Sequence, residues 1–348
     1  MSPVPVVLTR SALCALVLGG CTGKYAGSGG TTPVKPAGPR GGIAAAALPY
    51  QIVDGRTGRH VDEPAFWERV GRARAICVGE EHPNPHHHWV QLHVVGELGK
   101  RKPVKLGLGL EMVQRPFQGV LDDYTAKRID DATLRSRVGW EDRWGYDWGF
   151  YGPTIDAVIG AGGQVIALNA ARELTKKVSR QGLESLTPDE RAQLPELKLD
   201  VVEHRAWFDA LMSDLGGHGH GHGQPAAAGD PTSPHDAKPD KPAKAESAPP
   251  PGSPPAMPSM DRIYTVQVLW DETMADLAAK WLAANPSGQL VILAGNGHCH
   301  DSAIVGRLKR RGIADAISLR PVIDVDGGVA EVLAKPMNDY VIVLQMPK

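Results

Sequence analysis

Two carboxylates and four histidines crowd residues 78–88, which read VGEEHPNPHHH. Neutral imidazole ligates metal ions and haem iron, and a carboxylate beside an imidazole can exchange protons with it. The segment therefore predicts a metal site, a haem pocket or an acid–base pair. A solvated helix start is the simpler interpretation, because Asn84 suits an N-cap and Pro85 suits the first helical position.

The histidines of this segment cannot all face one site. His82 precedes the predicted helix and is expected to point into a pocket. Consecutive residues diverge by about 100° around a helix axis, so only one or two of the next three histidines can join it. We expect His86, one helical turn beyond His82, to be that residue, and His87 and His88 to be solvated or packed.

The two carboxylates, Glu80 and Glu81, stand where a strand is predicted to end. Side chains alternate along a strand, so one of them should point inward. The other could cap the following helix, whose first N–H groups are free and whose dipole favours negative charge. The sequence does not say which of them is inward.

A second stretch repeats the same pattern. Gly79 is followed three residues later by His82, and Gly295 is followed three residues later by His298. Each glycine permits a tight turn after a β-rich apolar run. A third such run ends at Glu111. In open α/β sheets sites form at the carboxyl ends of strands, so His82, Glu111 and His298 are predicted to converge.

Strand patterns alternate with helical patterns through the chain, which predicts an α/β fold with a central β-sheet flanked by helices and a helical lobe. The run KLGLGLEM places two glycines on one strand face, which indicates close approach of another backbone. The last run is expected to close the sheet. The predicted strands are residues 75–79, 105–112, 163–169, 289–298 and 339–346.

The N-terminus reads as an export signal. Arg10 precedes a short apolar run that ends in LGGC, which resembles a bacterial lipobox with Cys21 as the lipidated residue. Residues 1–20 are then a signal peptide and 21–48 a flexible tether. Thr22 favours sorting to the outer membrane. We therefore expect a protein held to the cell envelope by an N-terminal lipid anchor.

The rest of the chain, residues 49–348, is predicted to be one domain interrupted by a disordered insert at 216–259. The insert is rich in Pro and Ala and contains HGHGHG, residues 218–223, a tract able to bind metal ions loosely or to act as a solvated linker. Net charge is -1 over 348 residues, and without a basic excess we expect no nucleic-acid partner.

Two cysteines, Cys77 and Cys299, remain after the lipobox in an oxidising compartment. Their strands should be neighbours if the two Gly-x-x-His turns share a site. Cys77 lies mid-strand, however, whereas Cys299 lies beyond its strand in a turn. This mismatch of register favours two isolated thiols over a disulfide.

Several blocks in order give the chain a family resemblance: VGEEHPNPHHHWVQ, LGLEM, GWEDRWGYDWGFYGPTIDAV, VIALNAAREL, WDETMA and LAGNGHCHDSAIVGRL. They resemble the ChaN family of haem-binding, iron-regulated lipoproteins, in the superfamily that includes the Tiki and TraB proteins and the erythromycin esterases. The resemblance covers residues 53–215 and 261–308. The long insert and the two cysteines depart from the family pattern.

The resemblance implies haem or iron binding for uptake or storage, with haem as the ligand and a homodimer as a possible assembly. His82, Glu111 and His298 fall in the functional pocket that it implies. The segment GWEDRWGYDWGFYGP adds aromatic side chains, in which Trp140, Trp144 and Trp148 recur every four positions, as along one stripe of a helix. Such a stripe can be core or cofactor wall.

Three further residues are candidates for contact with haem. Tyr146 and Tyr151 are weak candidates for an iron ligand, and Arg172 is a candidate anchor for a propionate or a substrate, or a surface salt bridge.

The alternative is a hydrolase of the peptidase or esterase kind. His82 and His298 would hold a divalent metal ion, and Glu111 or Glu81 would deprotonate water, with His86 as a further ligand. Without a metal, the same residues would serve general acid–base chemistry. The residues alone do not separate these possibilities; the resemblance favours haem.

Overall fold

The computed structural model describes residues 41–101, 105–217 and 258–346. The predicted signal peptide, Cys21, most of the tether and most of the insert lie outside these residues. Both ends of the predicted insert lie within the described residues. Its first residues belong to a helix that continues to Gly217, and Ser259 caps the helix that starts at Met260. The predicted insert therefore begins too early and ends too late.

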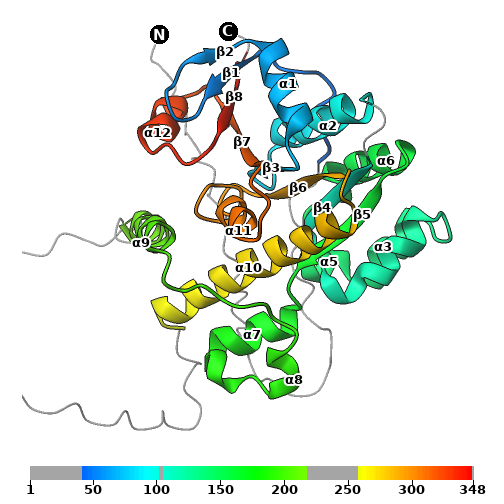
Figure 1. The fold of residues 1–348 in the computed structure, drawn as a ribbon, viewed down its shortest axis with the longest axis vertical. Helices are drawn as coiled ribbons and strands as arrows, with labels where there is room; N and C mark the ends of the chain where they lie inside the picture. The colour runs from blue at the N-terminus through cyan, green and yellow to red at the C-terminus, as the bar shows by residue number, and fades with distance from the viewer. Residues whose placement is uncertain (1–40, 102–104, 218–257, 347–348) are drawn as a thin grey trace, which may run out of the picture.

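A mixed eight-stranded sheet runs through the molecule in the order β2-β1-β8-β7-β3-β6-β4-β5 (Figure 1). Strands β3 to β8 pair in parallel, whereas β1 pairs antiparallel with β8 and β2. The last strand therefore lies inside the sheet, because the strand at residues 50–54 pairs along its outer side. The strands are β1 (Tyr50–Asp54), β2 (His60–Val61), β3 (Ala75–Glu80), β4 (Leu106–Gln114), β5 (Gln164–Asn169), β6 (Gln289–Gly295), β7 (Ala316–Ile323) and β8 (Tyr340–Leu344).

Twelve α-helices within the described residues surround this sheet. They are α1 (Glu63–Arg72), α2 (Pro85–Gly99), α3 (Gln118–Thr125), α4 (Asp131–Val138), α5 (Trp140–Arg143), α6 (Gly152–Gly160), α7 (Arg172–Gln181), α8 (Pro188–Arg191), α9 (Val202–Gly217), α10 (Met260–Ala284), α11 (Ile304–Arg310) and α12 (Gly328–Ala334). Short 3-10 turns are η1 (Arg115–Phe117), η2 (Trp148–Phe150) and η3 (Leu183–Ser185). Among the described residues, no helix has both the length and the apolar character needed to cross a membrane.

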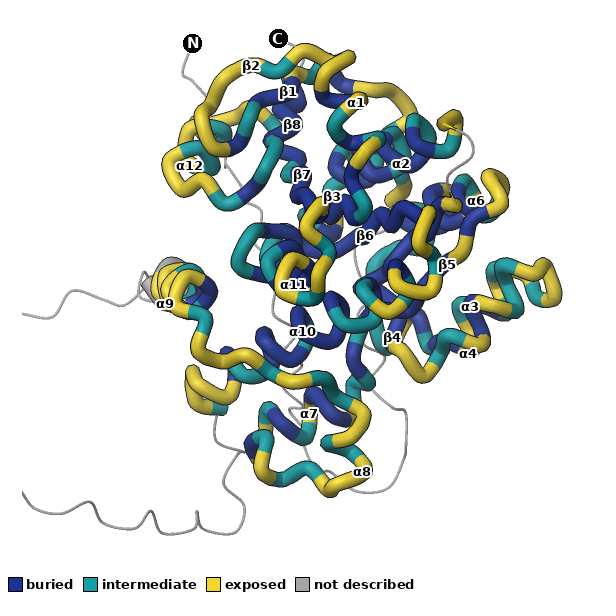
Figure 2. The backbone as a smooth tube through the Cα atoms, in the orientation of Figure 1, coloured by how far each residue is buried: buried dark blue, intermediate teal, exposed yellow. Residues whose placement is uncertain are grey.

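Both faces of the central strands are covered, which explains why β3, β4 and β6 are buried at every position (Figure 2). Helices α1, α2 and α6 pack on one face, and α10 and α11 pack on the other. A Cβ atom at Gly107 would lie 2.8 Å from Trp281 of α10, and one at Gly109 would lie 2.4 Å from Leu168. Side chains, not another backbone, occupy the space beside these two glycines.

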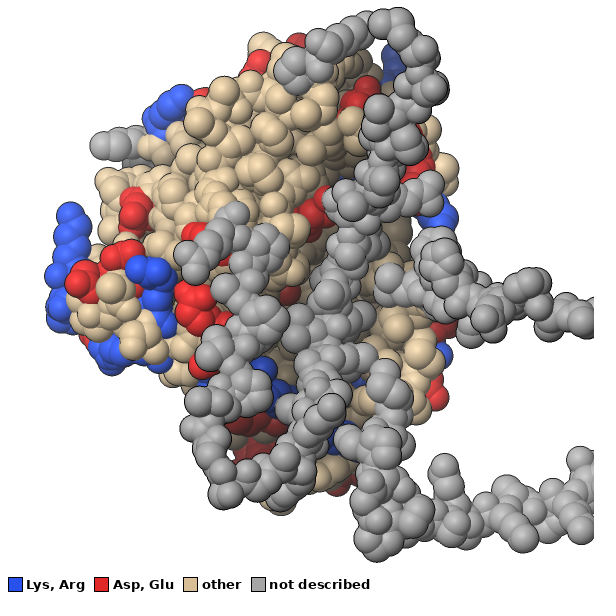
Figure 3. Space-filling view, turned by 180° about the vertical axis from the view of Figure 1, so that it is seen from behind, with Lys and Arg blue, Asp and Glu red and all other residues tan. Residues whose placement is uncertain are grey.

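A helical lobe lies apart from the sheet, as predicted. Helices α7 and α8 lie at the bottom of Figure 1, below α10. On the far side, charged side chains gather over the projecting lobe of α3 and α4, where Asp123 pairs with Arg128 and Arg137, and much of the face above it is uncharged (Figure 3).

The helix that follows the histidine segment begins as predicted. The Asn84 side chain accepts hydrogen bonds from the backbone N–H groups of His86 and His87, and Pro85 takes the first helical position. Helix α2 therefore starts three residues after His82 and fixes where the turn leaves β3.

Candidate functional site

The residues predicted to act together come from three neighbouring strands. Strand β6 pairs with β3 on one side and with β4 on the other, all in parallel, with Glu80 opposite Gly295. Their carboxyl ends therefore meet at one edge of the sheet. His82 follows β3, Glu111 lies near the end of β4, and His298 follows β6; all three are at least 93% buried, with exposed fractions of 7%, 7% and 6%.

Glu80 is the inward carboxylate of the first turn. Its Oε1 atom accepts hydrogen bonds from the Tyr151 hydroxyl at 2.8 Å and from Nδ1 of His82 at 2.7 Å. Its Oε2 atom accepts from Nε2 of Gln91 at 2.7 Å. Because an ionised carboxylate only accepts, His82 must carry its proton on Nδ1. Nε2 is then the basic nitrogen of neutral His82.

His88 supplies charge behind Glu80. The Gln91 amide donates to Glu80, so its Oε1 atom faces Nδ1 of His88 as an acceptor at 2.9 Å. Nε2 of His88 contacts the backbone oxygen of His82 at 2.9 Å. Both ring nitrogens therefore face acceptors. Nδ1 of His88 lies 3.6 Å from Oε2 of Glu80.

These contacts decide the state of Glu80. Burial alone raises the pKa of its carboxyl group, but the positive charge at His88 and the hydrogen bonds from His82 and Gln91 outweigh it and lower that pKa to about 2. Glu80 is therefore ionised at neutral pH and can hold His82 in one tautomer.

The remaining members of the first segment lie outside this arrangement. His87 is buried and its Nδ1 atom accepts a hydrogen bond from the backbone N–H of Glu81. Glu81 is half-buried. His86 donates its backbone N–H to the capping side chain of Asn84. His88 lies behind the site.

Glu111 lies between the two turns. Its Oε2 atom accepts a hydrogen bond from the backbone N–H of Gly295 at 2.7 Å, and its Oε1 atom lies 3.5 Å from Nε2 of His298. A Cβ atom added at Gly295 would lie 3.1 Å from Cε1 of His82 and 3.8 Å from Oε2 of Glu111. The glycine therefore leaves space that His82 and Glu111 share.

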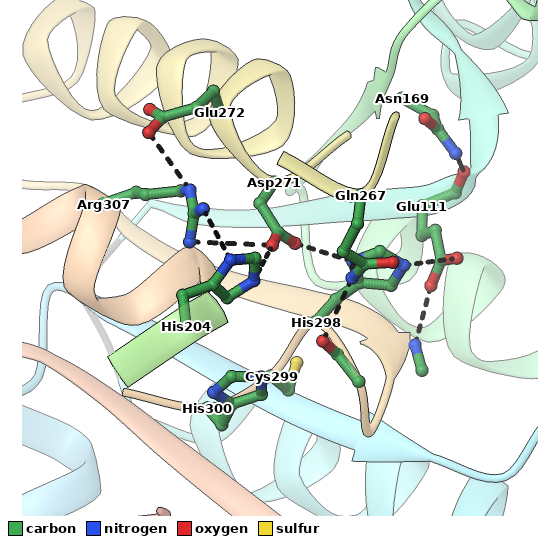
Figure 4. Close-up of polar contacts among 12 residues, drawn as sticks. Glu111, Asn169, His204, Gln267, Asp271, Glu272, His298, Cys299, His300 and Arg307 are labelled. Atoms are coloured by element: carbon green, nitrogen blue, oxygen red, sulfur yellow. Dashed lines mark hydrogen bonds and ion pairs between the residues drawn. The ribbon is translucent and has the colours of Figure 1, made fainter. Parts of the chain in front are cut away.

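His298 is held by a carboxylate that the sequence did not single out. Asp271, in the middle of α10, accepts a hydrogen bond from Nδ1 of His298 at 2.7 Å (Figure 4). Burial alone raises the pKa of Asp271, but Arg307, His298 and His204 hold it well below its usual range. Each Gly-x-x-His histidine thus has Nδ1 bound to a buried, ionised carboxylate. This arrangement fixes the ring and increases the basicity of Nε2.

Aromatic rings lie against one of the two histidines. The ring centroids of Trp144 and Tyr146 are 4.7 and 5.0 Å from that of His82. The predicted helical stripe of tryptophans is wrong, because Gly145 adopts a φ of 87° and ends the helix that holds Trp140. The turn still brings these aromatic side chains to the site.

Tyr151, one of the two candidate iron ligands, is fully buried, and its hydroxyl donates to Glu80. Burial and the negative charge of Glu80 raise the pKa of Tyr151 well above its usual value. Formation of a tyrosinate there is strongly disfavoured, and its role in this structure is to position Glu80. Tyr146, the other candidate, is half-buried beside His82.

Arg172 begins α7, and its guanidinium donates a hydrogen bond to the backbone oxygen of Asp142 at 2.7 Å. This holds α7 to the aromatic segment.

The prediction of two isolated thiols is wrong: Cys77 and Cys299 form a disulfide with a Cα–Cα distance of 5.3 Å. The register argument treated the chain as extended beyond β6. Instead, the N–H groups of His298 and Cys299 both bond to the oxygen of Gly295, so the chain turns back over the face of the sheet that Cys77 occupies.

Within the described ranges, no group of three or more His, Cys, Asp or Glu side chains has the geometry to hold a metal ion. The predicted divalent-metal set of His82, His298, Glu111, Glu81 and His86 therefore gains no support. The site instead holds two oriented imidazoles, of which His298 lies beside the Glu111 carboxylate and His82 beside aromatic rings.

Comparison with known proteins identifies the family of this α/β chain, whose sheet carries paired, carboxylate-bound histidines at its carboxyl edge. Residues 66–308 match the family described as "Haem-binding uptake, Tiki superfamily, ChaN". The chain belongs to this family.

Two solved structures are similar in fold. One, titled "Cofacial heme binding to ChaN of Campylobacter jejuni", is 15% identical with a TM-score of 0.58, and covers 85% of this chain and 97% of its own. The other, an erythromycin esterase mutant in its open conformation, is 12% identical with a TM-score of 0.41, covering 84% of this chain and 82% of its own. No curated protein matches the sequence significantly.

Proposed function

We propose that the protein binds haem for uptake or storage at the edge where β3, β4 and β6 end, with Nε2 of His82 as the iron ligand. The observation that carries the proposal is the pairing of His82 with Glu80 at 2.7 Å while its ring lies against Trp144 and Tyr146. A carboxylate on Nδ1 makes Nε2 a better donor to iron, and aromatic faces suit a porphyrin.

The residues fit haem in donor type and in surroundings. Imidazole nitrogen is a common haem ligand. Tyr146, half-buried beside His82, adds an oxygen donor within the same group of rings. Arg172 uses one of its five N–H donors on Asp142, so further donors remain for a propionate. Family membership supports the same ligand.

Haemin titration tests the proposal. The reference protein is the chain from Thr22 onward with His218, His220 and His222 changed to Ser, which removes adventitious iron binding by that tract. A Soret shift that saturates at a fixed ratio of haemin to protein is expected. His82→Ala should abolish the shift, whereas His60→Ala, at an exposed histidine of β2, should not alter it. An unchanged shift in His82→Ala would exclude His82 as the ligand.

A second candidate function rests on a different observation, the 3.5 Å approach of Glu111 to Nε2 of His298 with Asp271 on the opposite side of the ring. A carboxylate and an imidazole so arranged can transfer protons, and hydrolysis without a metal is the corresponding chemistry. Turnover of ester or peptide substrates that survives chelation and disappears in Glu111→Gln would favour this candidate over haem binding.

We also propose that the chain is anchored through Cys21 to the outer membrane and that haem binds to a homodimer. The LGGC motif supports the anchor. Cys21→Ala should move the protein from the membrane fraction to the soluble fraction. Sedimentation of the haem-loaded and haem-free protein tests the dimer, which would appear as a doubled mass on loading.

A further inference from the structure

Behind His298 lies a buried polar network that haem binding through His82 does not use. Asp271 is fully buried, and its two oxygens hold two different histidines (Figure 4). Oδ1 accepts from Nδ1 of His298 at 2.7 Å, and Oδ2 lies 3.0 Å from Nε2 of His204 on α9. One carboxylate of α10 therefore links the turn after β6 to a helix about a hundred residues earlier in the chain.

The protonation of His204 follows from its other partners. Nδ1 of His204 lies 3.4 Å from NH2 of Arg307 and 3.3 Å from the hydroxyl of Tyr264. A guanidinium only donates, so Nδ1 of His204 is an acceptor and Nε2 carries the proton. The Nε2–H group of His204 therefore faces Oδ2 of Asp271 at 3.0 Å, as a charge contact outside hydrogen-bond geometry. Because Asp271 is ionised, its Oδ1 atom accepts from His298, whose proton is on Nδ1.

Nearby arginines balance the charge of Asp271. Arg307 is fully buried and lies 3.6 Å from Oδ2 of Asp271 and 3.2 Å from Oε1 of Glu272. Arg310 and Arg311 also pair with Glu272, so the charge of Arg307 remains available to Asp271. Asp271 can thus stay ionised although it is buried. The Gln267 amide, 3.2 Å from Nδ1 of His298, also donates to the Gly297 oxygen; the shorter contact to Asp271 is the one that fixes the ring.

Helix α9 also covers the turn from outside. The ring centroids of Trp207 and His300 are 4.5 Å apart. A Cβ atom added at Gly297 would lie 3.5 Å from the Trp207 ring. Phe208 is fully buried and packs against Tyr264 of α10. The same helix therefore holds the turn through packing and holds His298 through Asp271.

The two histidines of the site differ in which parts of the chain orient their rings. His82 is oriented by Glu80, two residues away, and by partners on α2 and at Tyr151. His298 is oriented by residues of three separate helices, α9, α10 and α11.

We infer that His204 is a positioning residue for His298. Through Asp271 it keeps the proton of His298 on Nδ1 and turns the Nε2 edge of the ring toward Glu111. Docking of α9 therefore completes the half of the site that contains His298 and not the half that contains His82. What the completed site binds rests on the proposed function. The orientation of His298 does not.

The test uses histidine ¹⁵N spectra of the haem-free protein at one fixed pH. His204→Phe keeps the ring shape and removes the donor, whereas His204→Gln places an amide N–H near the position of Nε2. We expect the Nδ1-protonated signature of His298 in the wild type and in His204→Gln. In His204→Phe a second, Nε2-protonated signal should appear, with the signals of His82 unchanged.

Asp271→Asn is the positive control, since it removes the shared acceptor and should shift the His298 signal at least as far. Unchanged His82 signals show that each variant is folded. A His298 signature in His204→Phe identical to that of the wild type would overturn the inference. Haemin binding by the wild type is measured separately. Lack of haemin binding by the wild type would overturn the proposed function and leave the spectral result standing.

Discussion

Cys77 and Cys299 are joined although 222 residues separate them, and the bond lies directly behind both histidine turns. Cys299 follows His298 in sequence, and Cys77 lies in β3 two residues before Gly79. The disulfide therefore ties the strand that leads to His82 to the turn that carries His298.

Removing this bond should lower stability substantially. For the chain starting at Thr22, which keeps only these two cysteines, Cys77→Ala with Cys299→Ala should lose about 3 to 5 kcal/mol of unfolding free energy, because a loop of this length is no longer closed in the unfolded state. Urea unfolding measures the loss. Thiol titration of the denatured, unreduced wild type should find no free thiol, and two free thiols would contradict the bond.

The roles of the two tyrosines can be separated by removing one hydroxyl at a time. Tyr151→Phe deletes a hydrogen bond to ionised Glu80 and should cost about 1.5 to 3 kcal/mol of stability. It should leave the absorption spectrum of bound haem unchanged in position, because the Tyr151 hydroxyl is bound to Glu80. Tyr146→Phe is the matched variant for the haem spectrum. A haem spectrum lost in Tyr151→Phe but kept in Tyr146→Phe would reverse this assignment.

Stability should fall on mild acidification because buried neutral histidines resist protonation. Burial, the largest cause, lowers the pKa of His300 and of His87 to about 3. Above pH 6.5 both histidines are neutral whether the chain is folded or unfolded. Below it the unfolded chain takes up protons first, so stability is lost progressively between pH 6.5 and 3.

The measurement is unfolding free energy against pH from 7.5 to 5. His300→Gln should reduce the slope by up to about 1.4 kcal/mol per pH unit, the value for one proton. His60→Gln, at an exposed position, should leave the slope unchanged. Glu80 adds a loss at lower pH, since its pKa falls from 4.5 to about 2 in the folded protein and its contribution disappears through that window. Equal slopes in all three proteins would refute the role of His300.

The space at Gly295 can be filled by one methyl group. Gly295→Ala places a Cβ atom 3.1 Å from Cε1 and 3.4 Å from Nε2 of His82, so the imidazole must shift by a few tenths of an ångström. We expect haemin affinity to fall about tenfold, because a displaced ligand loses alignment with iron. Gly96→Ala in α2, with no atom within 4 Å of the added Cβ, should keep the affinity and gain about 0.5 to 1 kcal/mol of stability. Equal affinities in the two variants would show that His82 is not the ligand.

The sequence was sufficient for the strand ends and for the start of α2, because these depend on local signals. Glycines after apolar runs predicted the turns that carry His82 and His298, and Asn84 with Pro85 predicted the helix start. Local signals also predicted the α/β sheet and its helical lobe.

The residues that orient His298 could not be predicted from local sequence signals. Asp271 stands in the middle of a helix and His204 in another, and neither spacing nor flanking residues distinguish them from solvated positions. Their role depends on how α9, α10 and α11 pack, which is a tertiary property. The disulfide was not predicted for a related reason. The chain reverses direction in the turn after β6, so the register of extended strands does not give the position of Cys299.

The gap between Gly217 and the start of α10 divides the described domain into two portions, and each carries one half of the site. The earlier portion holds Glu80, His82 and Glu111, and the later portion holds Asp271 and His298. Strand β6 of the later portion lies between β3 and β4 of the earlier one. A single cut in residues 218–257 would therefore yield two pieces that stay covalently joined through Cys77 and Cys299, and neither piece alone would contain both histidines. The two portions should therefore reassemble into the domain when they are expressed as two separate polypeptides.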